Sequence, residues 1–169
     1  MIDIAATRTP AMEAMAKRLG ITLWYLGEQV AFAPKRAKLT IADGQDPQLR
    51  VLIERGVANA VIGLELLEAR DSMHARKAGL NQVLAAILAK KRCTVFFDQR
   101  AVRTATRERR AQILGRMRQN VVLCRKYKVR MAVVTLARSP YQLRSPHDLR
   151  AFCLLLGMLP GEANQVMRT

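Results

Sequence analysis

The chain has 169 residues, half of them hydrophobic, and its 29 Lys and Arg outweigh 13 Asp and Glu to give a formal net charge of +16. This length fits one domain, 1–169, and two at most, and the apolar content excludes a disordered chain. No apolar run approaches the roughly 20 residues that a membrane span needs, and no signal peptide is expected, so we expect a cytoplasmic protein.

Strand-like and helix-like segments alternate along the chain. The predicted strands are short and apolar, at 2–5, 21–26, 30–33, 39–42, 59–63, 93–97 and 130–136. The predicted helices lie at 10–20, 47–55, 80–91, 104–128 and 146–156, with a last short helix from Pro160. The order is that of a parallel sheet with right-handed helical crossovers.

Several helix ends carry chemical signals. Thr9 before Pro10 is an N-cap followed by an N1 proline, and Ser145 with Asp148 three residues later forms a variant of the capping box. The 104–128 segment repeats apolar residues at spacings of three and four, which predicts one long helix despite Gly115. The same spacing places four residues of the 80–91 helix inward: Val83, Leu84, Ile87 and Leu88.

About seven strands are close to a TIM-type barrel, although such barrels usually have about 250 residues. Periodicity leaves open whether the sheet closes. In either architecture the functional edge is the carboxyl end of the strands, where 65–79, 98–104 and 137–145 lie.

The net positive charge comes entirely from the second part of the chain. Residues 1–71 hold nine basic and nine acidic side chains, whereas residues 72–169 hold twenty basic and four acidic ones. Self-repulsion of this size favours a polyanionic partner, and arginine, which dominates here, suits phosphate. We therefore expect a nucleic-acid-binding surface, the alternative being a charge that serves solubility alone.

Aromatic residues, at 5% of the chain, are too few for a base-stacking platform, so recognition of the nucleic-acid backbone and shape is favoured.

Two basic clusters close predicted helices, at 90–92 and 125–130. Basic residues at helix C-termini also complement the helix dipole, but three successive charges exceed what that weak effect requires. Four arginines of the long helix partly share a face and form either a phosphate track or an ordinary solvated face: Arg107, Arg110, Arg118 and Arg125.

Candidate catalytic residues are sparse. The two histidines are His74, near Asp71 in an irregular stretch, and His147, which we expect at the surface. Asp98 ends a strand, and Arg100 two residues later favours an ion pair over catalysis. The three cysteines form no Cys-x-x-Cys pair, and we expect them to be buried, reduced thiols. No serine elbow or glycine-rich phosphate loop is present.

Three segments resemble a known family: 138–149 (Arg-Ser-Pro-Tyr-Gln-Leu-Arg-Ser-Pro-His-Asp-Leu), 79–85 (Gly-Leu-Asn-Gln-Val-Leu-Ala) and 94–100 (Thr-Val-Phe-Phe-Asp-Gln-Arg). They are similar to the archaeal ribonuclease P protein component 3 family, relatives of the eukaryotic thirty-kilodalton subunit. The resemblance runs from about Gln48 to Met158. It implies a TIM-like α/β barrel that is a non-catalytic subunit of an RNA-based endoribonuclease. That enzyme removes the 5′ leader of precursor tRNA.

The resemblance also implies partners: ribonuclease P RNA, protein component 2 and, indirectly, precursor tRNA. Mg²⁺ is expected at the active site of the RNA, and no cofactor is expected in the chain itself.

Related metalloenzymes, the polymerase-and-histidinol-phosphatase group, carry a His-x-His motif where this chain reads Asp3-Ile4-Ala5. The stretch from Val30 to Ala42 is too short for a crossover helix, so we expect an abbreviated barrel whose closure is open at that edge.

We expect the RNA contacts among ten basic residues near strand exits and helix ends: Arg50, Arg76, Lys77, Lys90, Lys91, Arg100, Lys126, Lys128, Arg138 and Arg144. Two other functions stay open. One is a metal-dependent phosphoesterase that uses Asp71, His74 and Asp98, and the other is a scaffold that binds an acidic protein.

Overall fold

The computed structural model describes residues 1–33, 37–67, 71 and 77–168. The strands are β1 (Ile2–Ala5), β2 (Thr22–Tyr25), β3 (Val30–Phe32), β4 (Leu39–Asp43), β5 (Ala60–Ile62), β6 (Thr94–Asp98) and β7 (Arg130–Val134). The α-helices are α1 (Pro10–Leu19), α2 (Leu49–Glu54), α3 (Gln82–Lys90), α4 (Gln99–Thr104), α5 (Arg107–Tyr127), α6 (Pro146–Leu155) and α7 (Pro160–Arg168). Two short 3₁₀ turns follow β5 and β7, η1 (Leu64–Leu66) and η2 (Pro140–Gln142).

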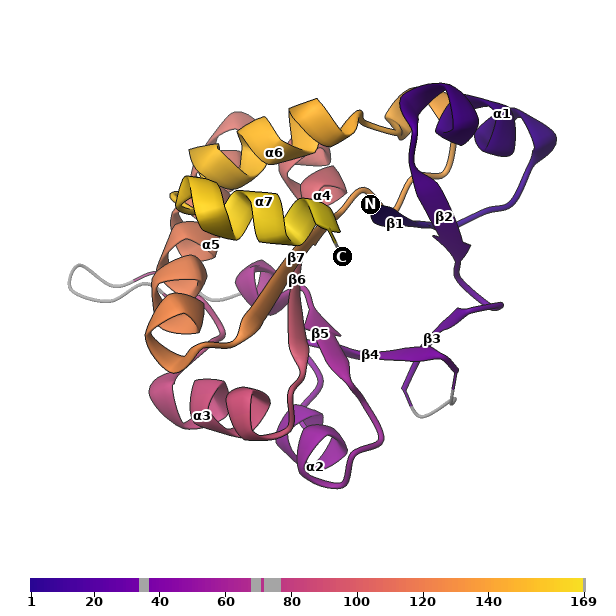
Figure 1. Ribbon diagram of the computed structural model, residues 1–169. Coiled ribbons are helices and arrows are strands. Elements are labelled where there is room, and N and C mark those ends of the chain that lie inside the picture. Colours follow the sequence, from indigo (N-terminus) through magenta and orange to yellow (C-terminus); the bar gives the residue numbers. More distant parts are fainter. Residues whose placement is uncertain (34–36, 68–70, 72–76, 169) are drawn as a thin grey trace.

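The strands form a ring with the helices outside it (Figure 1). One parallel pair joins β1 to β2, and a five-stranded parallel sheet runs in the order β3-β4-β5-β6-β7. Single parallel bridges, Ala5 to Ala137 and Leu26 to Val30, connect the two sheets. The prediction of an abbreviated TIM-like α/β barrel is confirmed: seven strands follow one another around the ring within the described residues.

Asp3 joins β1 to the chain that leaves β7. Its Oδ1 accepts hydrogen bonds from the Thr135 N–H (2.8 Å) and the Ile4 N–H (2.8 Å), and its Oδ2 accepts one from the Thr135 hydroxyl (2.6 Å). Desolvation of this fully buried carboxyl raises its pKa, although these hydrogen bonds oppose the rise. A side chain thus replaces part of the backbone ladder at this seam.

The second junction between the two sheets lies between β2 and β3, and β3 is followed directly by β4. β3 pairs with β4 in the register Val30 to Leu39, so the chain between the two strands has no room for a helix. The abbreviation predicted for this stretch is therefore confirmed. Backbone hydrogen bonds from Gly27 N–H to Val30 C=O (2.8 Å) and from Leu39 N–H to Gln29 C=O (3.0 Å) hold the bend.

Strand alternation divides the core into an inner and an outer layer. Ile41, Phe96 and Val134 are among the residues that fill the barrel interior, whereas Phe97 and Val133 pack outward against the helices. A third cluster lies between α1 and β2. All three cysteines are free and buried, as predicted.

The predicted caps are present. Thr9 Oγ1 accepts from the Met12 N–H (3.2 Å), and Ser145 with Asp148 completes a reciprocal capping box. Within the described ranges, no helix is both long and apolar enough to cross a membrane.

Two helix predictions were wrong in detail. The segment from Gln99 to Thr104 is a separate helix, α4, and α5 starts only at Arg107, because Ala105 adopts an extended conformation (φ −70°, ψ 150°). In α3, Leu84 and Leu88 face inward as predicted, but Val83 is exposed, and Ala85 is buried instead.

Candidate nucleic-acid interface

Six basic residues gather where β6 and β7 begin. α3 leads into β6 and α5 leads into β7, and the two strands pair in the register Thr94 to Arg130. The residues before these positions are therefore brought to one edge of the sheet. We call this set the β6–β7 basic cluster: Lys90, Lys91, Arg92, Lys126, Lys128 and Arg130.

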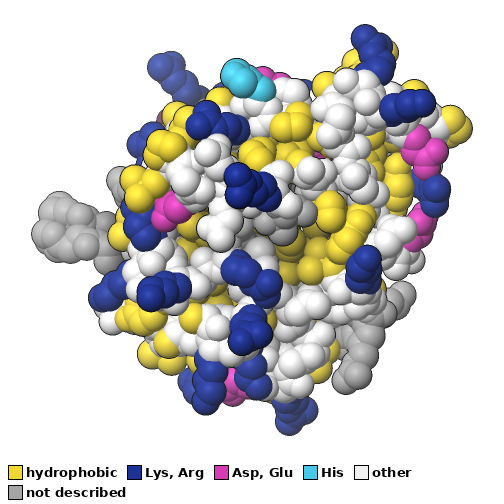
Figure 2. All heavy atoms as spheres, viewed as in Figure 1, with side chains coloured by type: hydrophobic (Ala, Val, Ile, Leu, Met, Phe, Trp, Pro, Cys, Tyr) yellow, Lys and Arg dark blue, Asp and Glu magenta, His cyan; other side chains and the backbone are white. Residues whose placement is uncertain are grey.

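The side chains of the β6–β7 basic cluster are exposed, and none forms an ion pair with a residue that the structure describes. Lys126 lies over the ring of its neighbour Tyr127 at 5.5 Å. Figure 2 shows Lys and Arg side chains over the lower part of the molecule, where α3 and the first residues of β6 and β7 lie in Figure 1, with few acidic side chains among them. The cluster is thus a surface of uncompensated positive charge.

The backbone of the cluster is unusual. Helices α1, α2, α3, α5 and α6 all end in the same turn, in which the N–H after a left-handed residue bonds to the C=O five positions earlier. In α1, α2 and α6 that left-handed residue is glycine: Gly20, Gly56 and Gly157. In α3 and α5 it is Arg92 (φ 55°) and Lys128 (φ 57°). A left-handed conformation disfavours residues that carry a Cβ, so these two basic side chains are kept at a cost in stability.

Nine of the ten residues predicted as RNA contacts are described by the structure, and these nine do not converge on one place. Four of them, Lys90, Lys91, Lys126 and Lys128, lie in the β6–β7 basic cluster. Sequence reasoning did not include Arg92 and Arg130 among the contacts, although both lie in the same two runs of basic residues. This cluster is at the amino end of the strands, opposite to the edge that the fold class favours.

Three predicted contacts lie at the carboxyl end of the strands, and two of them are engaged within the chain. Arg100 pairs with Asp98 (3.6 Å), as predicted, and Arg144 Nη1 donates to the backbone oxygens of Tyr141 (3.1 Å) and Leu143 (2.8 Å). Arg138 is exposed.

Two further predicted contacts lie elsewhere. Arg50 pairs with Glu54 on α2 (2.8 Å), and Lys77 is exposed. Arg76 lies outside the described residues.

Three of the four α5 arginines that partly share a face are bonded within the chain. Arg110 Nε donates to the Val102 C=O (2.9 Å), Arg118 Nε to the Leu155 C=O (3.1 Å), and Arg125 Nη2 to the Gly157 C=O (2.8 Å). These are carbonyls at or near helix ends, where some backbone oxygens lack an intrahelical partner. Arg107, the fourth of the set, is exposed.

Arg116 of α5 is fully buried and anchors the chain that follows β5. It donates to the backbone oxygens of Glu65 (3.1 Å) and Leu67 (2.6 Å) and to Asp71 Oδ1 (2.8 Å). Desolvation would raise the pKa of Asp71, but hydrogen bonds from Arg116 and from the Lys77 N–H outweigh it and hold that pKa below its usual value.

Asp71 and Asp98, two of the three residues of the hydrolytic alternative, therefore have structural partners. Asp98 caps α4 by accepting the Arg100 N–H (2.8 Å), and desolvation raises its pKa. His74 lies outside the described residues, and His147 is exposed as predicted. Among the residues that the structure describes, no three His, Cys, Asp or Glu side chains are grouped so that they could hold a metal ion.

Glu65 is a buried carboxyl without a hydrogen-bond partner among the described residues. Desolvation raises its pKa to about 7, and the charge of Asp98 adds to the rise. Nearby backbone N–H groups of Glu65 and Asp98 partly offset it. Its carboxyl is thus half-protonated near neutrality, a property that no sequence signal marked.

No family model matches the chain. The chain is similar to ribonuclease P protein component 3 of Methanosarcina mazei, with 33% identity over 94 residues (56% of this chain, 39% of the relative). It is also similar to that of Methanocaldococcus jannaschii, with 29% identity over 126 residues (70% and 53%). It therefore spans about two fifths to half the length of these curated relatives.

The fold matches a chain in the cryo-EM structure of archaeal ribonuclease P with mature tRNA. The TM-score is 0.69 at 18% identity, and the match covers 99% of this chain and 77% of that one. The predicted resemblance to archaeal ribonuclease P protein component 3 is thus confirmed in sequence, and the chain shares its fold with a chain of an archaeal ribonuclease P structure.

Proposed function

We propose that this chain is a non-catalytic protein subunit of ribonuclease P, which binds the RNA subunit and assists removal of the 5′ leader from precursor tRNA. The supporting observation is the fold match, which extends over 99% of the chain, to a chain of an archaeal ribonuclease P structure. The protein would act in the cytoplasm. Protein component 2 would be its partner, and Mg²⁺ would act at the RNA active site.

The β6–β7 basic cluster is our candidate for the RNA contact. Its six cations are exposed and without acidic partners among the described residues, and two of them occupy positions where other helices of the chain have glycine. Phosphate contacts by such cations supply most of the sequence-independent affinity for RNA.

The direct test is reconstitution. Cleavage of precursor tRNA by a ribonuclease P RNA at low Mg²⁺ is measured with this chain and component 2, and with each protein omitted in turn. Cleavage that requires the RNA and falls when this chain is omitted supports the proposal. Cleavage that is indifferent to this chain overturns it. Tight binding to component 2 without any RNA affinity would instead support the role of a protein scaffold.

A further inference from the structure

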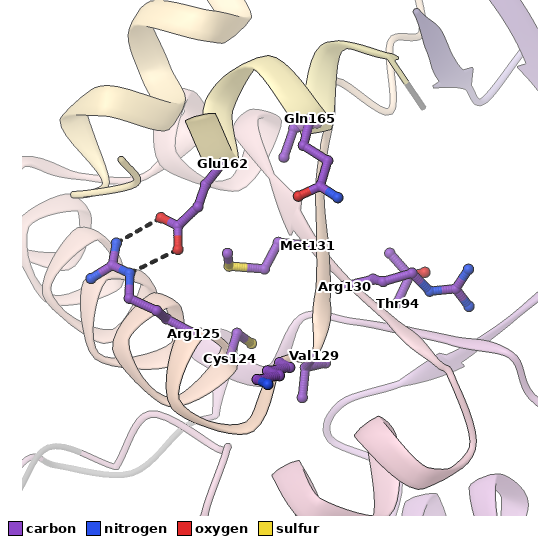
Figure 3. Close-up of a pocket in the computed structure, with 10 residues that line it drawn as sticks. Thr94, Cys124, Arg125, Val129, Arg130, Met131, Glu162 and Gln165 are labelled. Carbon is purple, nitrogen blue, oxygen red and sulfur yellow. Dashed lines mark hydrogen bonds and ion pairs between the residues drawn. The ribbon is translucent and has the colours of Figure 1, made fainter. Parts of the chain in front are cut away.

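A cavity of about 380 Å³ opens beside the β6–β7 basic cluster (Figure 3). It lies between the end of α5, the first residues of β7, and α7. Its size is at the lower end of the roughly 300–1,000 Å³ typical of small-ligand sites. Its walls combine apolar and hydrogen-bonding side chains, and two cations of the cluster, Lys128 and Arg130, line it.

The inner wall of the cavity is apolar. Cys124, Val129 and Val166 are buried, and the flexible thioether of Met131 extends from β7 into the space beside Glu162 (Figure 3). Desolvation raises the pKa of Cys124 to about 12, so its thiol is neutral and contributes apolar surface. A thioether packs well against a flat aromatic ring.

The polar wall of the cavity is held in place by hydrogen bonds and an ion pair within the protein. Arg125 and Glu162 form a two-pronged ion pair (2.8 and 2.7 Å), and Glu162 Oε2 also accepts the Leu159 N–H (2.7 Å). The Gln165 amide extends from α7 toward the cavity (Figure 3). These groups offer donors and acceptors to the edge of a ring with little loss of side-chain freedom on binding.

Of the two cations, Lys128 lines the cavity at an exposed position. The Arg130 side chain points away from the Arg125–Glu162 pair, alongside Thr94 (Figure 3). Neither Lys128 nor Arg130 forms a side-chain hydrogen bond or an ion pair with a described residue. A ligand that placed a ring against Met131 would therefore have its anionic group near Lys128, whereas the Arg130 side chain lies on the opposite side of β7 (Figure 3).

We propose that this cavity receives the base of one unpaired nucleotide of the bound RNA, with an adjoining phosphate on Lys128. The proposal rests on the function proposed above, since it takes the ligand to be RNA. Proteins read RNA mainly through unpaired bases that leave the stack. In a chain with so few aromatic residues, Met131 supplies the surface on which the base packs.

The test uses the full chain with ¹³C-labelled methionine methyl groups and two hairpin RNAs, one with a single-nucleotide bulge and one fully paired. Met131→Leu assigns the Met131 signal. We expect both RNAs to bind, the bulged one about tenfold more tightly, and only the bulged RNA to shift the Met131 methyl signal. The bulged base is already unpaired, so little energy is spent in exposing it.

A blocking variant and a matched control complete the test. Gln165→Trp covers the cavity mouth from an exposed position of α7 and should lower the affinity for the bulged hairpin to that for the paired one. Ala151→Trp places the same ring at an exposed position of α6 away from the cavity and should change neither affinity.

The failures of the two proposals are distinguishable. Binding of both RNAs with equal affinity, or with a Met131 shift that is the same for both, overturns the base site and leaves RNA binding intact. Absence of binding to either RNA overturns the proposed function and the base site together.

Discussion

Arg92 and Lys128 are two of the three described non-glycine residues with a positive φ, the third being Leu136 (φ 44°). Each takes the left-handed position that closes a helix, where Gly20, Gly56 and Gly157 close three other helices. Backbone strain of this kind costs on the order of 1 kcal/mol per residue. Both basic residues lie at one edge of the sheet, in the β6–β7 basic cluster.

We therefore expect Lys128→Gly to stabilise the protein by about 1 kcal/mol and to weaken RNA binding. Urea unfolding and an RNA titration measure the two effects on the same sample. Lys126→Gly is the control: Lys126 lies inside α5, so glycine there should destabilise the protein. Equal destabilisation by both substitutions would contradict the strain at Lys128.

Glu65 gives the stability of the protein a pH dependence. Its pKa in the folded chain is about 7, above the ordinary 4.5, so the folded state holds the proton more tightly than the unfolded chain does. The resulting contribution to stability is complete below about pH 4.5 and is lost as the pH rises through 7.

We expect Glu65→Gln to be more favourable at pH 8.5 than at pH 5, by up to about 3 kcal/mol in the free energy of unfolding. The measurement is urea unfolding of wild type and variant at both pH values. The exposed Glu108, changed to Gln, should give the same difference at both. A Glu65→Gln effect that does not change with pH would show that this carboxyl is ionised throughout.

At the scale of the element, helix α5 holds neighbouring segments in place through hydrogen bonds from its arginine side chains. Its arginines reach carbonyls of the segments around it, and the buried Arg116 fixes the chain after β5 through Glu65, Leu67 and Asp71. Many of the positive charges counted in the sequence are thus committed to the fold. The β6–β7 basic cluster, at the ends of α3 and α5, instead consists of exposed cations without an ion pair among the described residues.

Arg116→Met should destabilise the protein by about 3 kcal/mol, because it removes the buried hydrogen bonds from Arg116 to the Asp71 carboxylate and to the backbone oxygens of Glu65 and Leu67. Arg107→Met, at an exposed position of the same helix, should stay within about 0.5 kcal/mol of wild type. Chemical denaturation of both variants checks this. A similar small loss for each would mean that the Arg116 bonds contribute little to stability.

Chemical signals at helix ends made some helix starts predictable from the sequence. The Thr9 and Ser145 caps mark two helix starts plainly. The break between α4 and α5 falls at Thr104-Ala105-Thr106, which has no glycine or proline to mark it. The roles of the arginines were also hidden, since the carbonyl partners of Arg116 lie 49 and 51 residues away in the chain.

At the scale of the molecule, the sequence predicted the barrel and its short edge but not the place of the site. The runs around Lys91 and Lys128 are visible in the sequence, yet they meet only because β6 and β7 are neighbours in the register Thr94 to Arg130. The seam closed by Asp3 and Thr135 was equally invisible, because its partners are 132 residues apart. Position in the ring, rather than residue type, decides which cations act together.

Salt dependence separates this local cluster from the effect of net charge. Lys90→Gln with Lys91→Gln removes two exposed charges at the end of α3, inside the cluster. Lys17→Gln with Arg18→Gln removes two exposed charges at the end of α1, outside it. Both double variants have the same net charge, so any difference between them reports on where the RNA lies.

For the α3 variant we expect the slope of log affinity against log salt to fall in magnitude by about 1.4 to 1.8, since each phosphate contact contributes roughly 0.7 to 0.9. For the α1 variant we expect little change in slope, because α1 lies across the ring from α3 (Figure 1) and salt screens exposed charges that are far apart. RNA titrations over a series of salt concentrations give both slopes. Equal reductions would mean that the RNA is held by the total charge of the molecule and not by the β6–β7 basic cluster.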